Sequence, residues 1–271
     1  MTEVRGNAIT GEPVIFAPER ASRFPDAGCP FCPGNEHETP PELARVGDPW
    51  RVRVFDNKYP FAPKHEVIVE SPRHDATFGA IEHPAEIVAM YVERYRAMRG
   101  AAYIALFKNH GAMAGASLAH MHSQLAGVAF VPPRIERELA AFANGCPLCA
   151  PLQHVIDESA HFRRIAPHGS SFAYEQWIVP RRHAADFTTM SDDESDDLAL
   201  CLRDAARSME RIAPAYNWLF MNFPETRTGV SAPHWYVQAM PRTTTIAGFE
   251  IATGTFIDIV DPAAAAQRLR D

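Results

Sequence analysis

Four of the five cysteines lie in two short CxxC pairs, Cys29 with Cys32 and Cys146 with Cys149. In a reducing compartment a CxxC pair indicates either redox chemistry or a metal site. A redox pair opens a helix, whereas a Pro-Gly-Asn turn directly follows the first pair, so the metal interpretation is favoured. Each pair then needs two further ligands to complete a tetrahedral shell.

Histidines at matching positions can supply those ligands. His74 follows the first pair after a β-rich run, and His183 follows the second pair in the same way. The motif G-x-S-x-x-H-x-[H/Y]-x-Q then occurs at 115–124 and again at 229–238, and adds one more histidine to each copy. Four identical residues at fixed offsets indicate an internal duplication, and two copies are too few for a solenoid.

Two thiolates and two imidazoles form the closed shell that is typical of structural zinc sites. A lone histidine on a strand is usually a partly buried structural residue, but two histidine pairs in the same relation to two CxxC motifs favour ligands. Iron could replace zinc in either site, because ligand type alone does not settle the metal. The predicted ligands are Cys29, Cys32, His74 and His120 in the first copy, and Cys146, Cys149, His183 and His234 in the second.

The two copies differ at one position of the motif, where the first has His122 and the second has Tyr236. If His120 binds zinc, His122 is a second histidine about 7 Å further along the same strand face. A free imidazole is largely unprotonated at neutral pH and can attack phosphorus to form a phosphoramidate. Gln124, on the same face, can donate an amide N–H to a phosphate oxygen. The first copy is therefore predicted to be catalytic, and the second to have lost its nucleophile.

A glycine-rich run at 109–117 leads into the catalytic motif. On its own it would be interpreted as a turn between two strands. Beside His122 and Gln124 it favours a backbone that approaches a phosphate closely, so Gly115 is counted among the predicted substrate contacts.

The elements that must hold these residues repeat in one order: CxxC, strand, histidine, helix, strand, histidine. Hydrophobic periodicity predicts amphipathic helices over about 84–98 and 193–212. The expected strands are 66–69, 103–109, 175–179 and 218–222. We predict an α+β protein with two duplicated units, 1–135 and 136–271. Each unit is expected to be an antiparallel sheet with a packed helix, and the two units to be related by a pseudo-two-fold axis.

The composition is that of an ordinary globular protein, with 46% apolar and 22% charged residues in a chain of 271. A net charge of −7, without a basic stripe interleaved with aromatics, argues against nucleic-acid binding. No apolar run is long enough to cross a bilayer, so no membrane association is expected. The polar first ten residues lack the apolar core of a signal peptide, and the expected location is the cytoplasm.

These motifs resemble the histidine-triad superfamily and, within it, the galactose-1-phosphate uridylyltransferase family, whose members are tandem repeats of this unit. Gln124 in place of a third histidine is similar to the transferases of the superfamily rather than to its hydrolases. The 109–117 run and the second cysteine pair look closer to the ADP-glucose phosphorylase-like branch. The matching segments, which span nearly the whole chain, are 14–20, 51–60, 120–124 and 248–254.

The resemblance implies specific roles for individual residues. His122 is implied to be the residue that becomes nucleotidylated. Glu250 matches a glutamate that binds sugar hydroxyls from the partner subunit, since the family is typically homodimeric. Lys58 stands where many uridylyltransferases have an acidic residue near the nucleoside, which leaves the base open. The other implied substrate contacts are Arg20, Arg23, Asn57, Asn109, Ser117 and Gln124.

We therefore predict a cytoplasmic, homodimeric nucleotidyltransferase of galactose or other carbohydrate metabolism, with two structural zinc sites. A nucleotide sugar would give a nucleoside monophosphate to His122, and inorganic phosphate or a sugar 1-phosphate would then take it up in ping-pong order. Two alternatives stay open. One is a nucleotide-sugar hydrolase, in which water resolves the covalent intermediate. The other is a non-catalytic module in which both zinc sites are purely structural.

Overall fold

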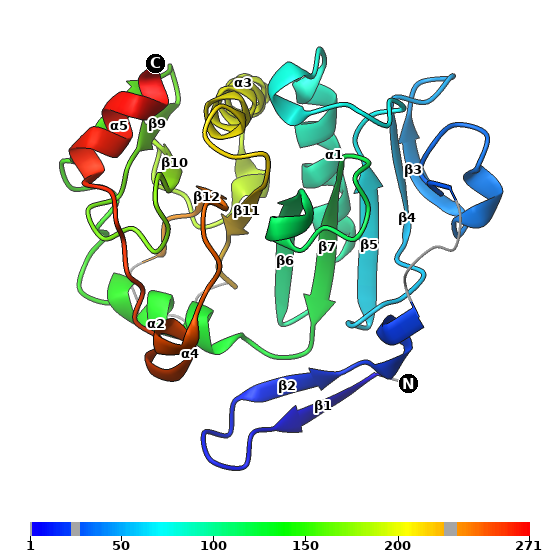
Figure 1. Cartoon of the computed structure of the whole chain (residues 1–271), viewed down its shortest axis with the longest axis horizontal. Coiled ribbons are helices and arrows are strands. Elements are labelled where there is room, and N and C mark those ends of the chain that lie inside the picture. Colours follow the sequence, from blue (N-terminus) through cyan, green and yellow to red (C-terminus); the bar gives the residue numbers. More distant parts are fainter. Residues whose placement is uncertain (1, 23–27, 225–231) are drawn as a thin grey trace.

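The computed structural model describes residues 2–22, 28–224 and 232–271. Its main feature is a ten-stranded sheet in which neighbouring strands are antiparallel (Figure 1). From one edge to the other the strands are β3 (Glu42–Val46), β4 (Val52–Asp56), β5 (Lys64–Val69), β7 (His122–Val128), β6 (Tyr103–His110), β11 (Tyr216–Met221), β12 (Tyr236–Pro241), β10 (Gln176–Pro180), β9 (Phe162–Ile165) and β8 (Val155–Glu158).

The strand order confirms the predicted α+β duplication. Five strands of the first half of the chain are followed across the sheet by five strands of the second half, in mirrored order. The halves meet at β6 and β11, where Asn217 lies opposite Asn109 and Tyr216 lies opposite His110. In this order β7 takes the place that β12 has in the other half, and β5 the place of β10, as expected for two units related by a pseudo-two-fold axis.

Two long helices pack on the sheet and against each other: α1 (Pro84–Ala97) and α3 (Asp192–Glu210). Their buried side chains share one hydrophobic core with strands of both halves. Helix α1 starts at Pro84, whose missing N–H is no loss in a first turn. Helix α3 starts with a capping box, in which Ser191 and Glu194 each accept a backbone N–H from the other.

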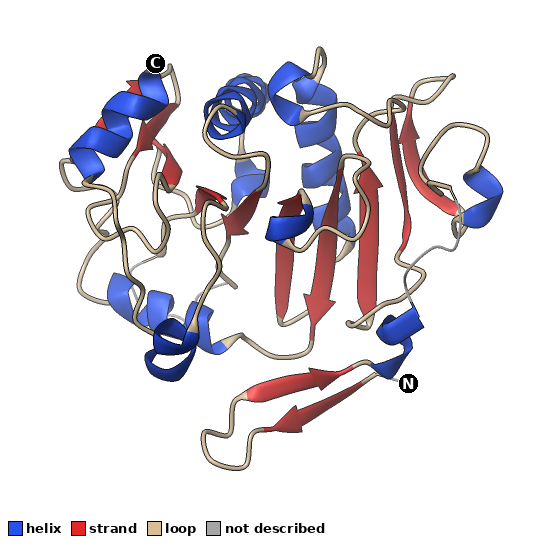
Figure 2. Ribbon diagram, viewed as in Figure 1, coloured by secondary structure: helices blue, strands red, loops and turns tan. Residues whose placement is uncertain are grey.

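The remaining elements lie outside this layer (Figure 2). An N-terminal hairpin forms a separate two-stranded sheet that projects from the body. The hairpin strands are β1 (Glu3–Gly6) and β2 (Pro13–Phe16), and the shorter helices are α2 (Pro133–Phe142), α4 (Gly248–Thr253) and α5 (Pro262–Arg270). Short 3-10 turns span Pro18–Ser22, Glu36–Glu38, Phe78–Ala80, Ala112–Ala114 and Phe187–Thr189. Of the helices described, none has the length and apolar character needed to span a bilayer.

The expected helices agree with the observed ones to within two residues at each end. The position of His120 differs from its expectation. The sequence predicts His120 and His122 on one strand, but β7 begins at His122 and His120 lies in the bend before it. There the chain leaves the ladder with β5, whose last pair is Val69 with His122, and turns the His120 ring towards the carbonyl of Ser71. The division between residues 135 and 136 stays a prediction, and both residues lie inside α2.

Candidate active site

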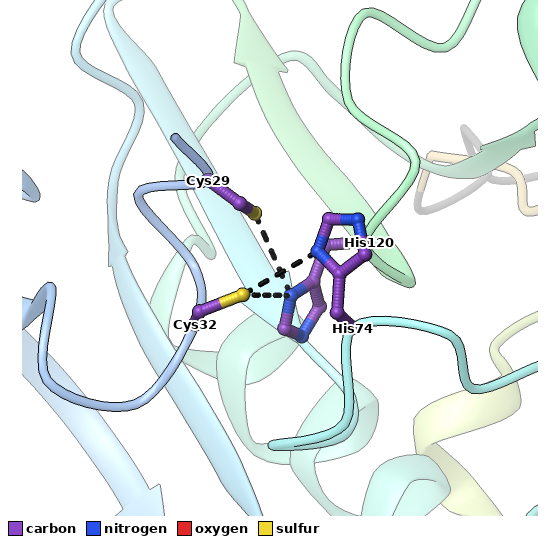
Figure 3. A group of neighbouring side chains, drawn as sticks. All are labelled: Cys29, Cys32, His74 and His120. Atoms are coloured by element: carbon purple, nitrogen blue, oxygen red, sulfur yellow. Dashed lines mark hydrogen bonds between the residues drawn. The ribbon is translucent and has the colours of Figure 1, made fainter. Parts of the chain in front are cut away.

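The first predicted metal site is a compact cluster of side chains (Figure 3). One candidate ligand atom from each of Cys29, Cys32, His74 and His120 lies within 4.8 Å of the others. Sγ of Cys32 lies 3.4 Å from Nδ1 of His74 and 3.6 Å from Nδ1 of His120. Sγ of Cys29 lies 3.6 Å from the same nitrogen of His120. Two sulfurs and two ring nitrogens in this arrangement could hold one tetrahedral metal ion.

A backbone carbonyl determines which nitrogen of His120 faces the cluster. Nε2 of this buried ring donates to the carbonyl oxygen of Ser71 at 2.7 Å. The proton therefore sits on Nε2, and Nδ1 keeps its lone pair for the cluster. A carbonyl partner of this kind is what orients histidines that bind metals.

The second predicted metal site has the same composition. Its ligand atoms also lie within 4.8 Å of one another. Sγ of Cys149 lies 3.2 Å from Nδ1 of His183 and 3.6 Å from Nδ1 of His234, and Sγ of Cys146 lies 3.5 Å from the latter. Nε2 of His183 donates to the carbonyl of Ala232 at 3.0 Å. This cluster could hold a metal ion in the same way as the first.

His122 stands at the start of β7, directly after the first cluster. Its Nδ1 donates to the carbonyl of His120 at 2.8 Å, so the free lone pair is on Nε2. The side chain is 6% exposed, and burial lowers the pKa of His122 to about 4. The ring is therefore neutral at neutral pH, which is the nucleophilic form of imidazole.

His122 lines a cavity of about 690 Å³. This volume is within the range of about 300–1,000 Å³ that small-molecule sites usually have. The wall is built from residues 20–124, and therefore from the first half of the chain. Its aromatic part is Phe31, Phe55, Tyr59, Phe61 and Phe107. The predicted residues that the structure brings together on this wall are Arg20, Asn57, Asn109, Gly115, Ser117, His122 and Gln124.

Gln124 is held in one orientation by His65, which the sequence analysis missed. The backbone N–H of Phe61 donates to Nδ1 of His65 at 3.3 Å, so the ring proton sits on Nε2. Nε2 donates to Oε1 of Gln124 at 3.0 Å, and the Asn57 amide donates to the same oxygen at 3.4 Å. The amide nitrogen of Gln124 is left to donate into the cavity. A histidine at the start of a buried strand was the one signal in the sequence.

Two further cavity residues are fixed by the backbone of one turn. Arg20 donates to the carbonyl of Tyr59 at 2.7 Å, and its guanidinium lies 5.1 Å from the ring centroid of Phe61. Asn57 accepts the N–H of Tyr59 through Oδ1 at 2.9 Å. The Asn57 amide nitrogen is thereby assigned as a donor, in agreement with its bond to Gln124.

A buried ion pair lies behind His122. Nζ of Lys108 contacts the carboxylate of Glu70, and both side chains are completely buried. The same carboxylate accepts the hydroxyls of Tyr91 and Ser123. Nζ of Lys108 also donates to the backbone carbonyl of His122 at 3.1 Å. A polar network in the core therefore contacts the strand that begins at His122.

The second copy uses its matching residues internally. Tyr236 replaces His122, and its hydroxyl donates to Glu138 at 3.2 Å. Gln238, the counterpart of Gln124, donates from its amide nitrogen to Glu175 at 2.6 Å and accepts from Arg134 through Oε1 at 2.6 Å. Positions 229–231 of the second motif lie outside the described residues.

Two predicted substrate contacts, Glu250 and Arg23, are not among the described residues that line the cavity. Glu250 lies in α4, where its carboxylate accepts the N–H of Ala247 at 3.1 Å, and it borders a separate hollow beside Ser171 and Thr244. Arg23 lies outside the described residues. Within one chain, the structure does not bring Glu250 to His122.

Comparison with known proteins gives consistent matches over the whole chain. Residues 61–271 match a family described as a domain of unknown function, DUF4921. ADP-glucose phosphorylase of Arabidopsis thaliana is 32% identical over an alignment of 326 positions, gaps included, which covers 99% of this chain and 92% of that protein. Galactose-1-phosphate uridylyltransferase of Thermotoga maritima is 27% identical, with 100% and 98% covered. The crystal structure of ADP-glucose phosphorylase from Arabidopsis thaliana with bound ADP-glucose has a TM-score of 0.84 at 33% identity, covering 100% of this chain and 99% of that chain.

Proposed function

This chain belongs to the DUF4921 family and to the family of ADP-glucose phosphorylase and galactose-1-phosphate uridylyltransferase, and we propose that it transfers a nucleoside monophosphate through a covalent bond to His122. The donor is a nucleotide sugar, and the acceptor is inorganic phosphate or a sugar 1-phosphate. The observation that supports this most is the orientation of His122. Its Nδ1 is committed to a backbone carbonyl, and its neutral ring lines the cavity with Gln124 and Asn109.

In the first step, Nε2 of His122 attacks the α-phosphorus of the nucleotide sugar. An N–P bond forms, the bond from phosphorus to the bridging oxygen breaks, and the electron pair leaves with the sugar 1-phosphate. Nδ1 keeps its proton and donates a hydrogen bond to the carbonyl of His120 throughout. This bond stabilises the positive charge that develops on the ring. The amide of Gln124 donates to a phosphate oxygen.

In the second step, an oxygen of the acceptor attacks the same phosphorus. The N–P bond breaks, and the electron pair returns to Nε2, so His122 is again neutral. Splitting one displacement into two gives ping-pong kinetics. The proposed phosphate contacts are Asn109, Gly115 and Ser117, and the proposed nucleotide contacts are Arg20, Arg23 and Asn57.

We propose that both clusters bind zinc and that the zinc is structural. Two sulfurs with two Nδ1 atoms are a donor set that zinc prefers, and His120 already has the carbonyl partner of a metal ligand. Zinc would cross-link the CxxC segment to the chain around His120, and so hold the start of β7. His122 is not among the four ligands and keeps its lone pair. Iron is the alternative metal for either cluster.

We also propose that the protein is a homodimer, because apolar side chains are exposed at both ends of the chain. Ile9 in the hairpin is 95% exposed, and Ile251 and Ile259 near the C-terminus are 75% and 71% exposed. We propose that a second copy of the chain covers these side chains. In the dimer, Glu250 would bind sugar hydroxyls in the partner's cavity. Light scattering that gave a monomeric mass would contradict this.

The cytoplasm is the proposed location, because the thiols of both clusters stay reduced there. The proposed partners are small molecules. A net charge of −7 does not favour a nucleic acid.

The test is intact-protein mass spectrometry after brief incubation with UDP-glucose, ADP-glucose and other nucleotide sugars, each without an acceptor. We expect an adduct of one nucleoside monophosphate, which inorganic phosphate or glucose 1-phosphate then removes. In His122→Ala the adduct is expected to be absent and turnover to fall by at least ~10³-fold. Metal content should be unchanged, because His122 is outside both ligand sets.

Other outcomes point to other functions. Free nucleoside monophosphate released without an acceptor would identify a hydrolase. The absence of both adduct and product over a wide donor panel would favour a non-catalytic double-zinc module. Undiminished turnover in His122→Ala would refute the assignment of the nucleophile.

A further inference from the structure

Asn217 of the second half of the chain contacts two parts of the cavity wall in the first half. It lies on β11, opposite Asn109 across the seam with β6, and is 8% exposed. Its Nδ2 donates to Oδ1 of Asn109 at 2.8 Å and to the carbonyl of Ala114 at 2.9 Å. Its Oδ1 accepts from Nη1 of Arg242 at 3.2 Å.

The donor and the acceptor of each of these hydrogen bonds can be assigned from the groups involved. The Arg242 guanidinium can only donate, and the Ala114 carbonyl can only accept, so the orientation of the Asn217 amide is fixed from both sides. Asn109 must then present its oxygen to Asn217. Among the described residues, none accepts a hydrogen bond from Nδ2 of Asn109, which lines the cavity. That nitrogen is a donor left for a ligand.

The same part of the second half also supports the glycine-rich loop. A Cβ atom on Gly111 would lie 2.9 Å from the carbonyl oxygen of Pro214 and 2.8 Å from Cβ of Ala215. Gly111 has a φ of +79°, in the left-handed region that favours glycine. The loop that leads to Gly115 and Ser117 is therefore packed closely against the segment that enters β11.

We infer that Asn217 is a positioning residue, which the second half supplies so that Asn109 presents an N–H donor to a phosphate group in the cavity. This inference rests on the proposed function for the identity of the ligand. It gives the half without a nucleophile a part in the reaction: Arg242 fixes Asn217, and Asn217 fixes Asn109. The group recognised is a phosphate oxygen, which accepts but cannot donate.

Asn217→Asp tests this with a nearly isosteric change. The carboxylate still accepts from Arg242, but it cannot donate to Asn109 or Ala114. The Asn109 amide would turn over to donate to the carboxylate, and its oxygen would then face the phosphate. We expect the affinity for a nucleoside monophosphate to fall roughly 10–100-fold, the equivalent of losing one buried donor. The affinity for the matching nucleoside, which has no phosphate, should stay within about twofold.

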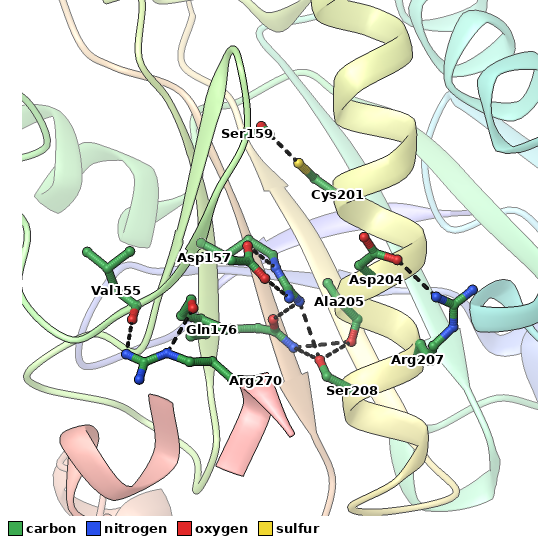
Figure 4. A network of polar contacts seen from close by, with 12 residues as sticks. Val155, Asp157, Ser159, Gln176, Cys201, Asp204, Ala205, Arg207, Ser208 and Arg270 are labelled. Atoms are coloured by element: carbon green, nitrogen blue, oxygen red, sulfur yellow. Dashed lines mark hydrogen bonds and ion pairs between the residues drawn. The ribbon is translucent and has the colours of Figure 1, made fainter. Parts of the chain in front are cut away.

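The second half offers a matched control in Gln176, which has the same bonding pattern away from the cavity (Figure 4). Its Oε1 accepts from Nη1 of Arg164 at 3.0 Å, and its Nε2 donates to the carbonyl of Ala205 at 3.2 Å. Gln176→Glu therefore makes an equivalent amide-to-acid change in a buried network. We expect it to lose stability without changing the ratio of nucleotide to nucleoside affinity.

The measurement is isothermal titration calorimetry of the metal-loaded protein with AMP, adenosine, UMP and uridine, using the pair that the wild type binds. Asn217→Ala serves as a second variant and keeps the test open if the aspartate variant does not fold. It removes the donor to Asn109 but does not favour the flipped orientation of the Asn109 amide, so its loss of nucleotide affinity should be the smaller of the two. Wild-type nucleotide affinity in both variants, or an equal loss of nucleoside affinity, would overturn the inference. A wild type that binds AMP or UMP but forms no covalent adduct would refute the proposed function and leave this test intact.

Discussion

Replacing Lys108 by methionine tests the buried ion pair behind His122. Both charged side chains are completely buried. Removing one partner of such a pair leaves an uncompensated charge in the core, which costs about 3–5 kcal/mol. In a chain of this size each kcal/mol corresponds to roughly 2–4 °C in Tm, so Lys108→Met should melt about 6–20 °C below the wild type.

A double variant separates lost charge from lost packing. Glu70→Gln with Lys108→Met removes both charges and keeps an oxygen that can accept from Tyr91 and Ser123. We expect it to recover most of the stability and to lie within about 1–2 kcal/mol of the wild type, because a buried ion pair is often close to neutral against an uncharged replacement. The exposed pair of Arg99 with Asp186 gives the control, and Arg99→Met should cost less than about 1 kcal/mol.

The assay is urea unfolding of the zinc-loaded protein, followed in parallel by far-UV circular dichroism and tryptophan fluorescence. Coincident transitions would justify a two-state comparison of the free energies of unfolding. A Lys108→Met variant within about 1 kcal/mol of the wild type would refute the reasoning. So would a double variant as unstable as the single one, because the cost would then come from packing and not from the unpaired charge.

Two other predictions concern His65 and the metals. His65→Phe removes the donor that fixes Gln124, and turnover should fall roughly 10–100-fold; wild-type turnover would contradict this role. Burial lowers the pKa of His65 to about 4. Between pH 6.5 and 4 the unfolded chain therefore binds more protons at this residue than the folded chain does. The free energy of unfolding should decrease as the pH falls through this window. The free energy of unfolding of His65→Phe should depend less on pH there. Elemental analysis should find two zinc ions per chain in the wild type and one in each of the variants Cys32→Ser and Cys149→Ser. Turnover should be reduced more in Cys32→Ser. Variants that keep both ions would refute the ligand assignment.

Local patterns in the sequence were sufficient to predict the two long helices, whereas the shorter helices α2, α4 and α5 were not predicted. The amphipathic period predicted α1 and α3, and the structure adds a proline at the start of α1 and a Ser-x-x-Glu cap at the start of α3. The continuous sheet was not predictable in this way, because the pairing of β6 with β11 joins segments that are far apart in the chain. Alternation along one strand indicates which face is buried and not which strand lies beside it.

The same distinction separates the site residues that were found from those that were missed. The two candidate metal clusters and His122 were predicted from a motif that repeats, so each copy supported the other. His65 and Asn217 act on partners that are 59 and 108 residues away, and each is one polar residue without a motif. Lys108 had a visible signal, because it is a charge that directly follows the apolar run 103–107 of β6. That signal indicates a buried partner but does not identify Glu70.

The seam between β6 and β11 bears on what a shortened chain would do. A polypeptide that ended after α2 would have β6 as an open edge, with a row of unpaired backbone N–H and C=O groups. Antiparallel pairing is compatible with a two-fold axis, so two such fragments could join through their β6 strands into a symmetric particle with two copies of His122. The intact polypeptide satisfies that edge internally, at fixed stoichiometry and independently of concentration. Under the proposed function, one half would then carry the reacting histidine, and the other would hold the edge strand of the first half in place.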